Sequence, residues 1–311
     1  MNHDRRKFCV YSTAAAATLV TGQLSSSASR GSLVEPSVLH RQQKEQQICA
    51  FIKFIQELSF DELAETIAEQ GFQGIEATIR PDGLIEPDDV PEKLPLLAAA
   101  LEKRNINITV MTTRINTANA TNELILKTAA DLGITRYRTD YYRYDLKKPV
   151  VPQIEAFRPL AAGLAKLNRK LGMTGIYQNH AGPKYLGSTM WDLNQLLNDI
   201  DPNEIGVAFD IRHAIASAGQ SWPVLWNVIQ QKVKAVYVKD FRWKGLQTEN
   251  VPLGKGVLDP KFFKMIRSKG IHVPISLHVE YLQNAGLDKN VKALGDDLKT
   301  LHKLLSIDKS E

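Results

Sequence analysis

The feature that most constrains this chain is an alternation of short apolar segments with amphipathic ones, repeated eight times from residue 48 onward. The apolar segments predict strands at Ile48–Ile55, Gly74–Ile79, Ile106–Met111, Thr135–Thr139, Met173–Gln178, Gly206–Asp210, Ala235–Lys239 and Pro274–Glu280. The amphipathic segments predict one helix after Ser59 and others at Leu94–Arg104, Asn122–Leu132, Gln153–Leu171, Met190–Asn198, Pro223–Gln231, Lys261–Ser268 and Asn290–Leu305. Such a repeat predicts parallel strands joined by right-handed helical crossovers.

Local signals support these boundaries and select a closed barrel. Ser59 and Glu62 have the spacing of a capping box, and Gly71, Gly133 and Gly172 follow the predicted helix ends. An open doubly wound sheet would also alternate, but no glycine-rich phosphate loop follows the first strand. We therefore expect an α/β fold, a single (β/α)8 TIM barrel over residues 48–311.

The first 30 residues have the pattern of an export signal. Arg5, Arg6, Lys7 and Phe8 precede a short apolar run, and small residues follow near Ser27–Ser29. The paired arginines resemble a twin-arginine signal, which predicts the twin-arginine export machinery as a partner and a periplasmic location in a bacterium. An ordinary secretory leader is the alternative. Residues 31–47 are polar and predict a linker, and the apolar run is too short for stable membrane insertion.

Charge and cysteine content exclude some functions. The formal net charge is +5, of which residues 1–30 carry +3, so the remainder is near neutral and no nucleic-acid partner is expected. Cys9 lies in the predicted leader, which leaves Cys49 as a single thiol, expected to pack in the core.

Polar residues gather where the predicted strands end. In a parallel barrel these carboxyl ends form the catalytic face. Alternation places the following groups on the same side of their strands: Glu76 with Thr78 and Arg80, Gln178 with His180, Asp210 with Arg212, Tyr237 with Lys239, and His278 with Glu280. So many ionisable groups converging without partners would be costly, which predicts a metal ion, a polyhydroxyl substrate or both in the mouth. The arginines and tyrosines of the fourth unit form either part of this site or a solvated rim: Arg136, Tyr137, Arg138, Tyr141, Tyr142, Arg143 and Tyr144.

These strand-end sequences resemble the sugar phosphate isomerase/epimerase-like superfamily, also called the xylose isomerase-like barrels. The resemblance covers nearly all of residues 48–305 and is strongest in the segments 74–81, 177–180, 209–213, 237–240, 251–256 and 277–280. The Pro-Leu-Gly-Lys-Gly stretch at 252–256 is a recurring feature of these proteins. Tagatose and psicose epimerases, hydroxypyruvate isomerase, inosose dehydratase and endonuclease IV belong to this superfamily.

The resemblance implies a divalent cation (manganese, magnesium or cobalt) held by one side chain from each of strands five to eight. The matching positions here are Gln178, Asp210, Tyr237 and Glu280. Gln178 replaces a glutamate, and Tyr237 is a poor ligand because its pKa is near 10. This leaves Gln178, Asp210 and Glu280 as the expected ligands, with His180 or His213 as substitutes.

The same resemblance implies proton abstraction next to a carbonyl. With Gln178 in place of a carboxylate, Glu280 is the expected base, and the opposing acid is Lys239, His180 or His278. The expected substrate-binding residues are Glu76, Arg80, Arg212, His213 and Asp240.

The primary hypothesis is a metal-assisted enzyme of sugar metabolism, an isomerase or epimerase acting on a keto sugar or related polyol. The protein could form an oligomer. A lyase or dehydratase acting on a keto-sugar or 3-keto-glycoside is the first alternative. A non-catalytic carbohydrate-binding barrel is the second. An endonuclease IV-like nuclease would need a trinuclear zinc site, which the seven histidines and the near-neutral chain disfavour.

Overall fold

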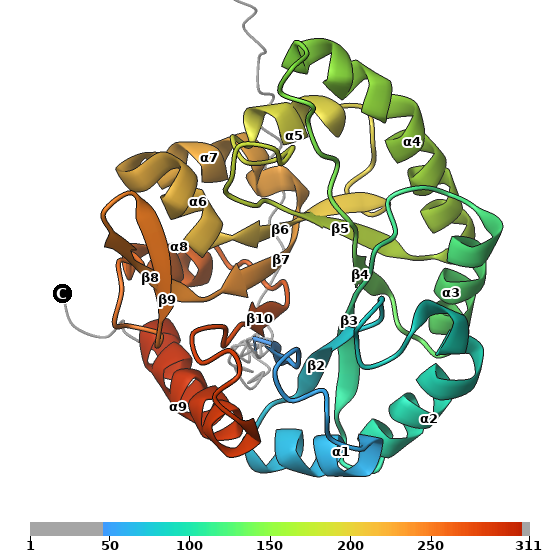
Figure 1. The fold of residues 1–311 in the computed structure, drawn as a ribbon, viewed down its shortest axis with the longest axis vertical. Coiled ribbons are helices and arrows are strands. Elements are labelled where there is room, and N and C mark those ends of the chain that lie inside the picture. Colours follow the sequence, from blue (N-terminus) through green and yellow to red (C-terminus); the bar gives the residue numbers. More distant parts are fainter. Residues whose placement is uncertain (1–45, 307–311) are drawn as a thin grey trace, which may run out of the picture. The chain divides into compact units, whose positions relative to one another are not determined.

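A computed structural model describes residues 46–306 and confirms the eight-stranded barrel (Figure 1). Its strands all pair in parallel and close the sheet in the order β1, β10, β7, β6, β5, β4, β3, β2. The bounds are β1 (Ile48–Phe51), β2 (Gly74–Thr78), β3 (Asn107–Thr112), β4 (Arg136–Arg138), β5 (Thr174–Gln178), β6 (Ile205–Asp210), β7 (Val233–Val238) and β10 (Ile275–Leu277).

Helices surround the strands, as Figure 1 shows in a view along the barrel. Their bounds are α1 (Phe60–Glu69), α2 (Val90–Glu102), α3 (Ala120–Asp131), α4 (Val150–Leu171), α5 (Trp191–Leu196), α6 (Ile211–Ala218), α7 (Trp222–Ile229), α8 (Lys261–Ser268) and α9 (Leu287–Ser306). The described helices include none with the length and apolar character needed to cross a membrane.

The predicted start and stop signals operate as expected. Ser59 accepts a hydrogen bond from the backbone N–H of Glu62, whose carboxylate accepts one from the Ser59 N–H, so the capping box is formed. Gly172 ends α4 with φ of 67°, a left-handed conformation that costs glycine little.

Apolar packing fills the barrel on both sides of its wall. Between strands and helices lies the main core, which includes Trp226, Phe209 and Phe262. Inside the barrel, Val110, Ile176, Ala208, Ala235 and Tyr237 form a second buried cluster. The interior is therefore packed, which restricts any ligand to the mouth.

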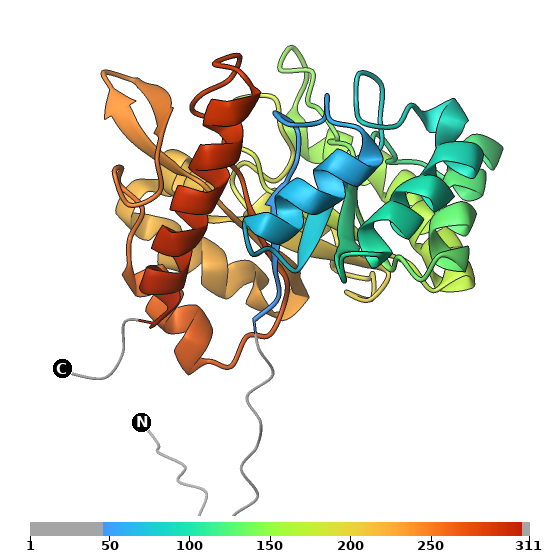
Figure 2. The same cartoon turned by 90° about the horizontal axis from the view of Figure 1, so that it is seen from below.

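Two elements differ from the sequence-based expectation. Arg212 does not continue the alternation of the sixth strand, because α6 begins at Ile211 and Asp210 is its N-cap. Beyond the seventh strand, β8 (Asp240–Lys244) and β9 (Gln247–Val251) form an antiparallel hairpin that was not predicted. Figure 2 shows this hairpin rising from the side of the barrel at which the strands end.

The expected export signal, its Cys9 and the linker up to residue 45 lie outside the described residues. The predictions of twin-arginine export and periplasmic location therefore remain predictions. Cys49 is a free and fully buried thiol, as expected, and burial raises its pKa to about 12.

Candidate active site

A cavity of about 460 Å³ opens at the carboxyl ends of the strands. Its lining comes from the carboxyl ends of the strands, the loops that follow them and the hairpin: Phe51, Lys53, Arg80, Arg138, Tyr141, Gln178, His180, Ala181, Arg212, His213, Lys239, Thr248, Asn250 and Glu280. Seven of the predicted site residues are in this lining, and three more, Glu76, Asp210 and His278, lie beneath it or at its floor. The expected convergence of strand-end residues is present.

At the base of the site, Glu76 is a buried carboxylate whose two oxygens are both hydrogen-bonded. It accepts hydrogen bonds from Thr112, from Ser276 Oγ at 2.5 Å and from His278 Nε2 at 3.0 Å. Burial opposes ionisation, but His278 and Arg138 together with these bonds lower the pKa of Glu76 to about 2. Glu76 is fully buried and does not line the cavity, so the direct substrate contact expected for it does not fit this geometry.

His278 connects this base to the upper layer. Its Nε2 contacts Glu76, and its Nδ1 lies 3.8 Å from Glu280 Oε1. Burial alone would lower the pKa of His278, but the Glu76 charge raises it. His278 is 1% exposed and absent from the cavity lining, which suits a group that positions Glu280 rather than one that touches substrate.

In the upper layer, the Lys239 ammonium lies between two carboxylates. Its Nζ is 3.0 Å from Glu280 Oε2 and 3.4 Å from Asp210 Oδ2. Burial disfavours the charged amine, yet the two carboxylates raise the pKa of Lys239. The same ammonium holds the pKa of Asp210 and of Glu280 below their usual values against the effect of burial. All three groups are therefore charged at neutral pH.

Gln178 is oriented by its neighbours. Its Oε1 accepts from Arg138 at 3.0 Å and from Tyr141 Oη at 2.5 Å, while its Nε2 donates to Asp210 Oδ2 at 2.7 Å. Reversing the amide would place N–H groups against two donors and an oxygen against a carboxylate. Gln178 thus presents a donor, not an oxygen, toward Asp210.

This donor set does not fit the expected divalent cation. Cations of this kind need several oxygen or nitrogen ligands around one point. The point shared by Asp210 and Glu280 has the Lys239 ammonium beside it, and Gln178 turns its NH2 group toward Asp210. Within residues 46–306 no group of three or more His, Cys, Asp or Glu side chains is arranged to hold a metal ion. The residue that reaches the two carboxylates from β7 is Lys239, and Tyr237 lies deeper, beside His278 with 4.7 Å between ring centroids.

The two histidines of the mouth are neutral. Burial lowers the pKa of His180 to about 4 and that of His213 well below its usual value. His180 donates from Nδ1 to the Ala181 carbonyl at 2.8 Å, which leaves Nε2 as an unprotonated nitrogen. His213 Nδ1 accepts from Arg212 at 3.1 Å, so its proton is on Nε2, 3.7 Å from Asp210 Oδ2. The two rings pack against one another at a tilt of 33°, with centroids 3.9 Å apart.

Two residues of the hairpin complete the wall, and the sequence offered no signal for them. Arg212 donates to Thr248 Oγ1 at 2.7 Å and to Asn250 Oδ1 at 3.3 Å. These β9 side chains lie in a polar, half-buried strand without a hydrophobic pattern, so neither was predicted. Arg138 and Tyr141, left open as site or rim, belong to the lining, whereas Tyr137, Tyr142 and Tyr144 are packed in the core.

Asp240 does not belong to this site, although a substrate contact was expected for it. Its carboxylate accepts hydrogen bonds from the backbone N–H groups of Phe241, Gly254, Gly256 and Leu258. A Cβ at Gly256 would lie 2.2 Å from Asp240 Oδ1, so glycine is required for this approach. Asp240 therefore holds the hairpin against the Pro-Leu-Gly-Lys-Gly loop.

The fold and the strand-end geometry define a class, the xylose isomerase-like TIM barrel. The sequence profile of this family matches residues 64–304, so the chain belongs to it. Among curated protein sequences no match was found.

Solved structures with this fold include enzymes of two reaction types. The chain is 14% identical to 3-keto-D-glucoside 4-epimerase of E. coli, with a TM-score of 0.64 over 83% of this chain and 100% of the other. It is 12% identical to D-psicose 3-epimerase of Clostridium cellulolyticum H10, with a TM-score of 0.66 over 84% of this chain and 99% of the other. It is 16% identical to a probable 3-DHS dehydratase of Bacillus anthracis, with a TM-score of 0.63 over 83% of this chain and 99% of the other. The likeness at these identities is one of fold.

Proposed function

We propose that this protein is a sugar isomerase or epimerase that acts on a keto sugar or related polyol by moving a proton next to a carbonyl group. The observation that carries the proposal is the Lys239 ammonium held between Asp210 and Glu280 at the wall of the cavity. A fixed cation next to a carboxylate base is what enolisation requires, since one group removes the proton and the other stabilises the oxygen that gains charge.

In the proposed reaction, Glu280 takes the proton from the carbon next to the carbonyl. The C–H electron pair forms a carbon–carbon double bond, and the carbonyl π electrons move to oxygen, which gives an enediolate. Lys239 lines the cavity as a cation and stabilises this oxyanion. Return of the proton from Glu280 to the neighbouring carbon, with transfer of the hydroxyl proton between the two oxygens, yields the isomer.

Isomerisation is favoured over epimerisation by the state of His180. An epimerase of the two-base type needs a protonated group on the face opposite Glu280. His180 is neutral above about pH 4, and its free Nε2 carries no proton. A single base that works on one face of an enediolate is sufficient for isomerisation.

The divalent metal expected by resemblance has no part in this proposal, because the Gln178–Lys239 arrangement does not supply its ligands. We propose instead that Lys239 supplies the positive charge. Its raised pKa also disfavours a Schiff base, which requires a neutral amine.

Deuterium uptake from heavy water tests the proposal without the product having to be known. Keto sugars and 3-keto-glycosides are incubated with the protein in D2O, and exchange at carbon is followed by NMR. We expect exchange with the wild-type chain and a loss of about 10²–10⁴-fold in Glu280→Gln, the usual contribution of a general base. Glu102→Gln, a matched change of an exposed side chain at the end of α2, should exchange at the wild-type rate.

The outcomes separate the alternatives. Exchange with a rearranged sugar as product supports the isomerase. Exchange or consumption with loss of water identifies the lyase. Binding of sugars with no exchange in any of them would contradict the proposal and identify a carbohydrate-binding barrel.

A further inference from the structure

The cavity has more positive charge than its own carboxylates neutralise. Five cations line it, Lys53, Arg80, Arg138, Arg212 and Lys239, whereas the carboxylates at or below it are Glu76, Asp210 and Glu280. Lys239 pairs with Asp210 and Glu280, and Arg138 lies 3.9 Å from Glu76. The remaining cations have no carboxylate within ion-pair distance anywhere in the described part of the chain.

These unpaired cations are of two kinds. Arg212 is bonded to Thr248, Asn250 and His213, and its guanidinium packs over the Phe241 ring at 4.9 Å, so its place is set by the protein. No residue between 46 and 306 makes a hydrogen bond to the charged end of Arg80 or Lys53. Partial burial lowers the pKa of Arg80, and the nearby cations Arg138 and Arg114 lower it further.

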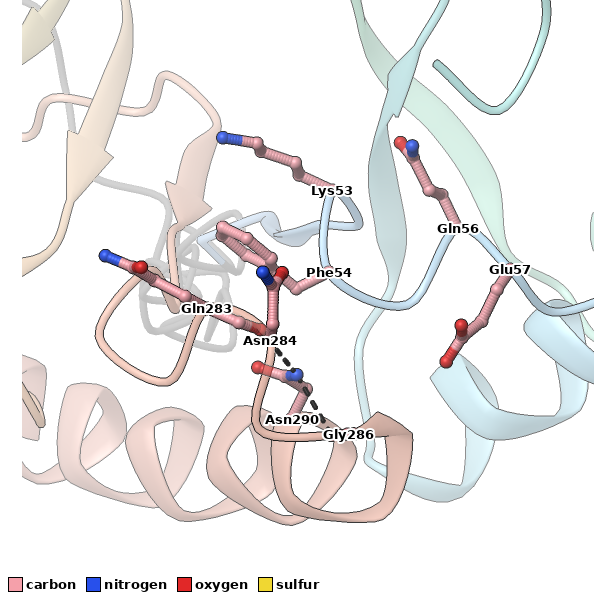
Figure 3. A pocket seen from close by; sticks show the side chains of 8 residues that line it. All are labelled: Lys53, Phe54, Gln56, Glu57, Gln283, Asn284, Gly286 and Asn290. Atoms are coloured by element: carbon pink, nitrogen blue, oxygen red, sulfur yellow. Dashed lines mark hydrogen bonds between the residues drawn. The ribbon is translucent and has the colours of Figure 1, made fainter. Parts of the chain in front are cut away.

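Lys53 follows β1, and Arg80 follows β2, so both belong to the same side of the mouth. Figure 3 shows the Lys53 side chain extending away from the Glu57 carboxylate, its neighbour four residues along the chain. Lys53 contacts the Phe54 ring instead, at 4.8 Å. The acidic side chain closest in sequence therefore does not neutralise it.

Arg138 is a third cation in the cavity lining, and it is not fully bonded by the protein. Its NH1 donates to Gln178, but its Nε is buried and has no hydrogen-bond partner within residues 46–306. Arg138 is 8% exposed, and a buried donor without a partner costs about 1–3 kcal/mol.

We propose that the substrate carries an oxyanion group, a carboxylate or a phosphate, and that Lys53, Arg80 and Arg138 bind it at the β1–β2 side of the mouth. The inference rests on the proposed function and narrows its substrate to acidic keto sugars. Binding the anion there leaves the rest of the sugar to extend toward Glu280 and Lys239, which line the same cavity. Recognition of a carboxylate or phosphate by arginine is strong because two N–H groups can bind two oxygens.

Calorimetric titration tests this without turnover. The probes are D-fructose, 5-keto-D-gluconate for a carboxylate and D-fructose 6-phosphate for a phosphate. We expect one of the two acids to bind the full chain at least tenfold more tightly than D-fructose at low salt, with the advantage falling as sodium chloride is added. Whichever acid binds more tightly identifies the source of the oxyanion.

Variants locate the effect. Arg80→Gln and Lys53→Gln should each reduce the preference for the acid about tenfold and change D-fructose binding less than twofold. Arg104→Gln removes the same charge from an exposed position after α2 and should leave all three affinities unchanged. Removing an unpaired cation should not lower the melting temperature of Arg80→Gln, since no partner is lost.

The proposal is overturned if neither acid binds more tightly than D-fructose, including the case in which none binds. It is also overturned if Arg80→Gln and Lys53→Gln both leave the preference unchanged. Because binding and deuterium exchange are measured separately, acid-selective binding without exchange would disprove the enzyme and retain the anion site. Deuterium exchange in a neutral sugar, without tighter binding of either acid, would support the enzyme and disprove the anion site.

Discussion

At the scale of single residues, the chemistry proposed for this site depends on Lys239. The Lys239 ammonium contacts both Asp210 and Glu280. It provides a positive charge at the place where the resemblance to the family predicts a metal ion. Which charge is present determines how the enediolate oxygen is stabilised. Metal addition, metal removal and metal analysis therefore test whether Lys239 or a metal ion supplies this charge.

We predict that proton exchange is insensitive to EDTA and to added Mn²⁺ and that the purified wild-type protein holds no stoichiometric divalent ion by elemental analysis. Lys239→Ala should lose about 10²–10³-fold in exchange, the usual effect of removing a transition-state donor. It should also gain Mn²⁺ binding, because two carboxylates are left facing one another. Lys234→Ala, earlier on β7, is the control and should gain none. A stoichiometric metal ion in the wild type would contradict this assignment.

The pH dependence follows from the same charges. Lys239 lowers the pKa of Glu280, and burial lowers that of His180 to about 4, so both are unprotonated above that range. Lys239 has its pKa raised above the usual 10.5 and stays charged up to that pH. We expect kcat/KM to be flat between about pH 5 and 9 and to fall only below about pH 4. An acidic limb near pH 6–7 would show that a histidine with an ordinary pKa controls the reaction.

At the scale of elements, the sequence predicted what hydrophobic periodicity and glycine can signal. The eight strands and their helices were placed to within a few residues because each has an apolar face and a stop, such as Gly172 after α4. The helix α6 was missed because Asp210 serves both as the last strand residue and as a helix cap. The hairpin β8–β9 was missed because its residues are mostly exposed or half-buried and follow no apolar pattern.

The attachment of that hairpin can be tested at Gly256. A Cβ there would lie 2.2 Å from both Asp240 Oδ1 and the Phe241 carbonyl oxygen. We expect Gly256→Ala to displace the loop, to destabilise the fold by about 1–3 kcal/mol as overpacking does, and to weaken sugar binding by moving Thr248 and Asn250. Gly163→Ala is the control: in α4 the new Cβ would meet no described atom within 4 Å outside the adjacent helix backbone, so this variant should melt at or slightly above the wild-type temperature. Equal melting temperatures for Gly256→Ala and the wild type would disprove the role of Asp240 and Gly256 in attaching the hairpin.

At the scale of the whole molecule, buried charge makes the stability of the barrel depend on pH. Glu76 joins β2 to β3, β4 and β10 through Thr112, Arg138, Ser276 and His278. The pKa of Glu76 is about 2 in the folded state against 4.5 for the free group, so the native state binds this proton more weakly than the unfolded chain. Its contribution is present above about pH 4.5 and is lost as the pH falls toward 2.

We predict that the free energy of unfolding falls by about 3 kcal/mol over this range from Glu76 alone, at about 1.4 kcal/mol per pKa unit. Glu76→Gln should be less stable than the wild type at pH 7 and should lose less stability between pH 4.5 and 2. Denaturant unfolding of both proteins at each pH measures the difference. Parallel pH profiles would show that Glu76 does not contribute to the acid sensitivity.

The site could be predicted only in part at this scale. The strand order brings Gln178, Asp210, Lys239 and Glu280 to one mouth, and alternation along the strands was enough to predict that. The orientation of the Gln178 amide depends on Arg138 and Tyr141 from another unit, which no local pattern encodes. The position of the Lys239 Nζ likewise requires coordinates, since an ammonium on a four-carbon stem reaches many places from one backbone position.

An ammonium group that is covalently part of the chain makes the proposed catalyst independent of the metal supply. It is delivered with every copy at translation, cannot be removed by chelators or exchanged for a wrong ion, and needs no supply from the surroundings. If Lys239 carries the reaction as proposed, newly folded protein is competent at once, and scarcity of manganese or excess of zinc leaves its output unaltered.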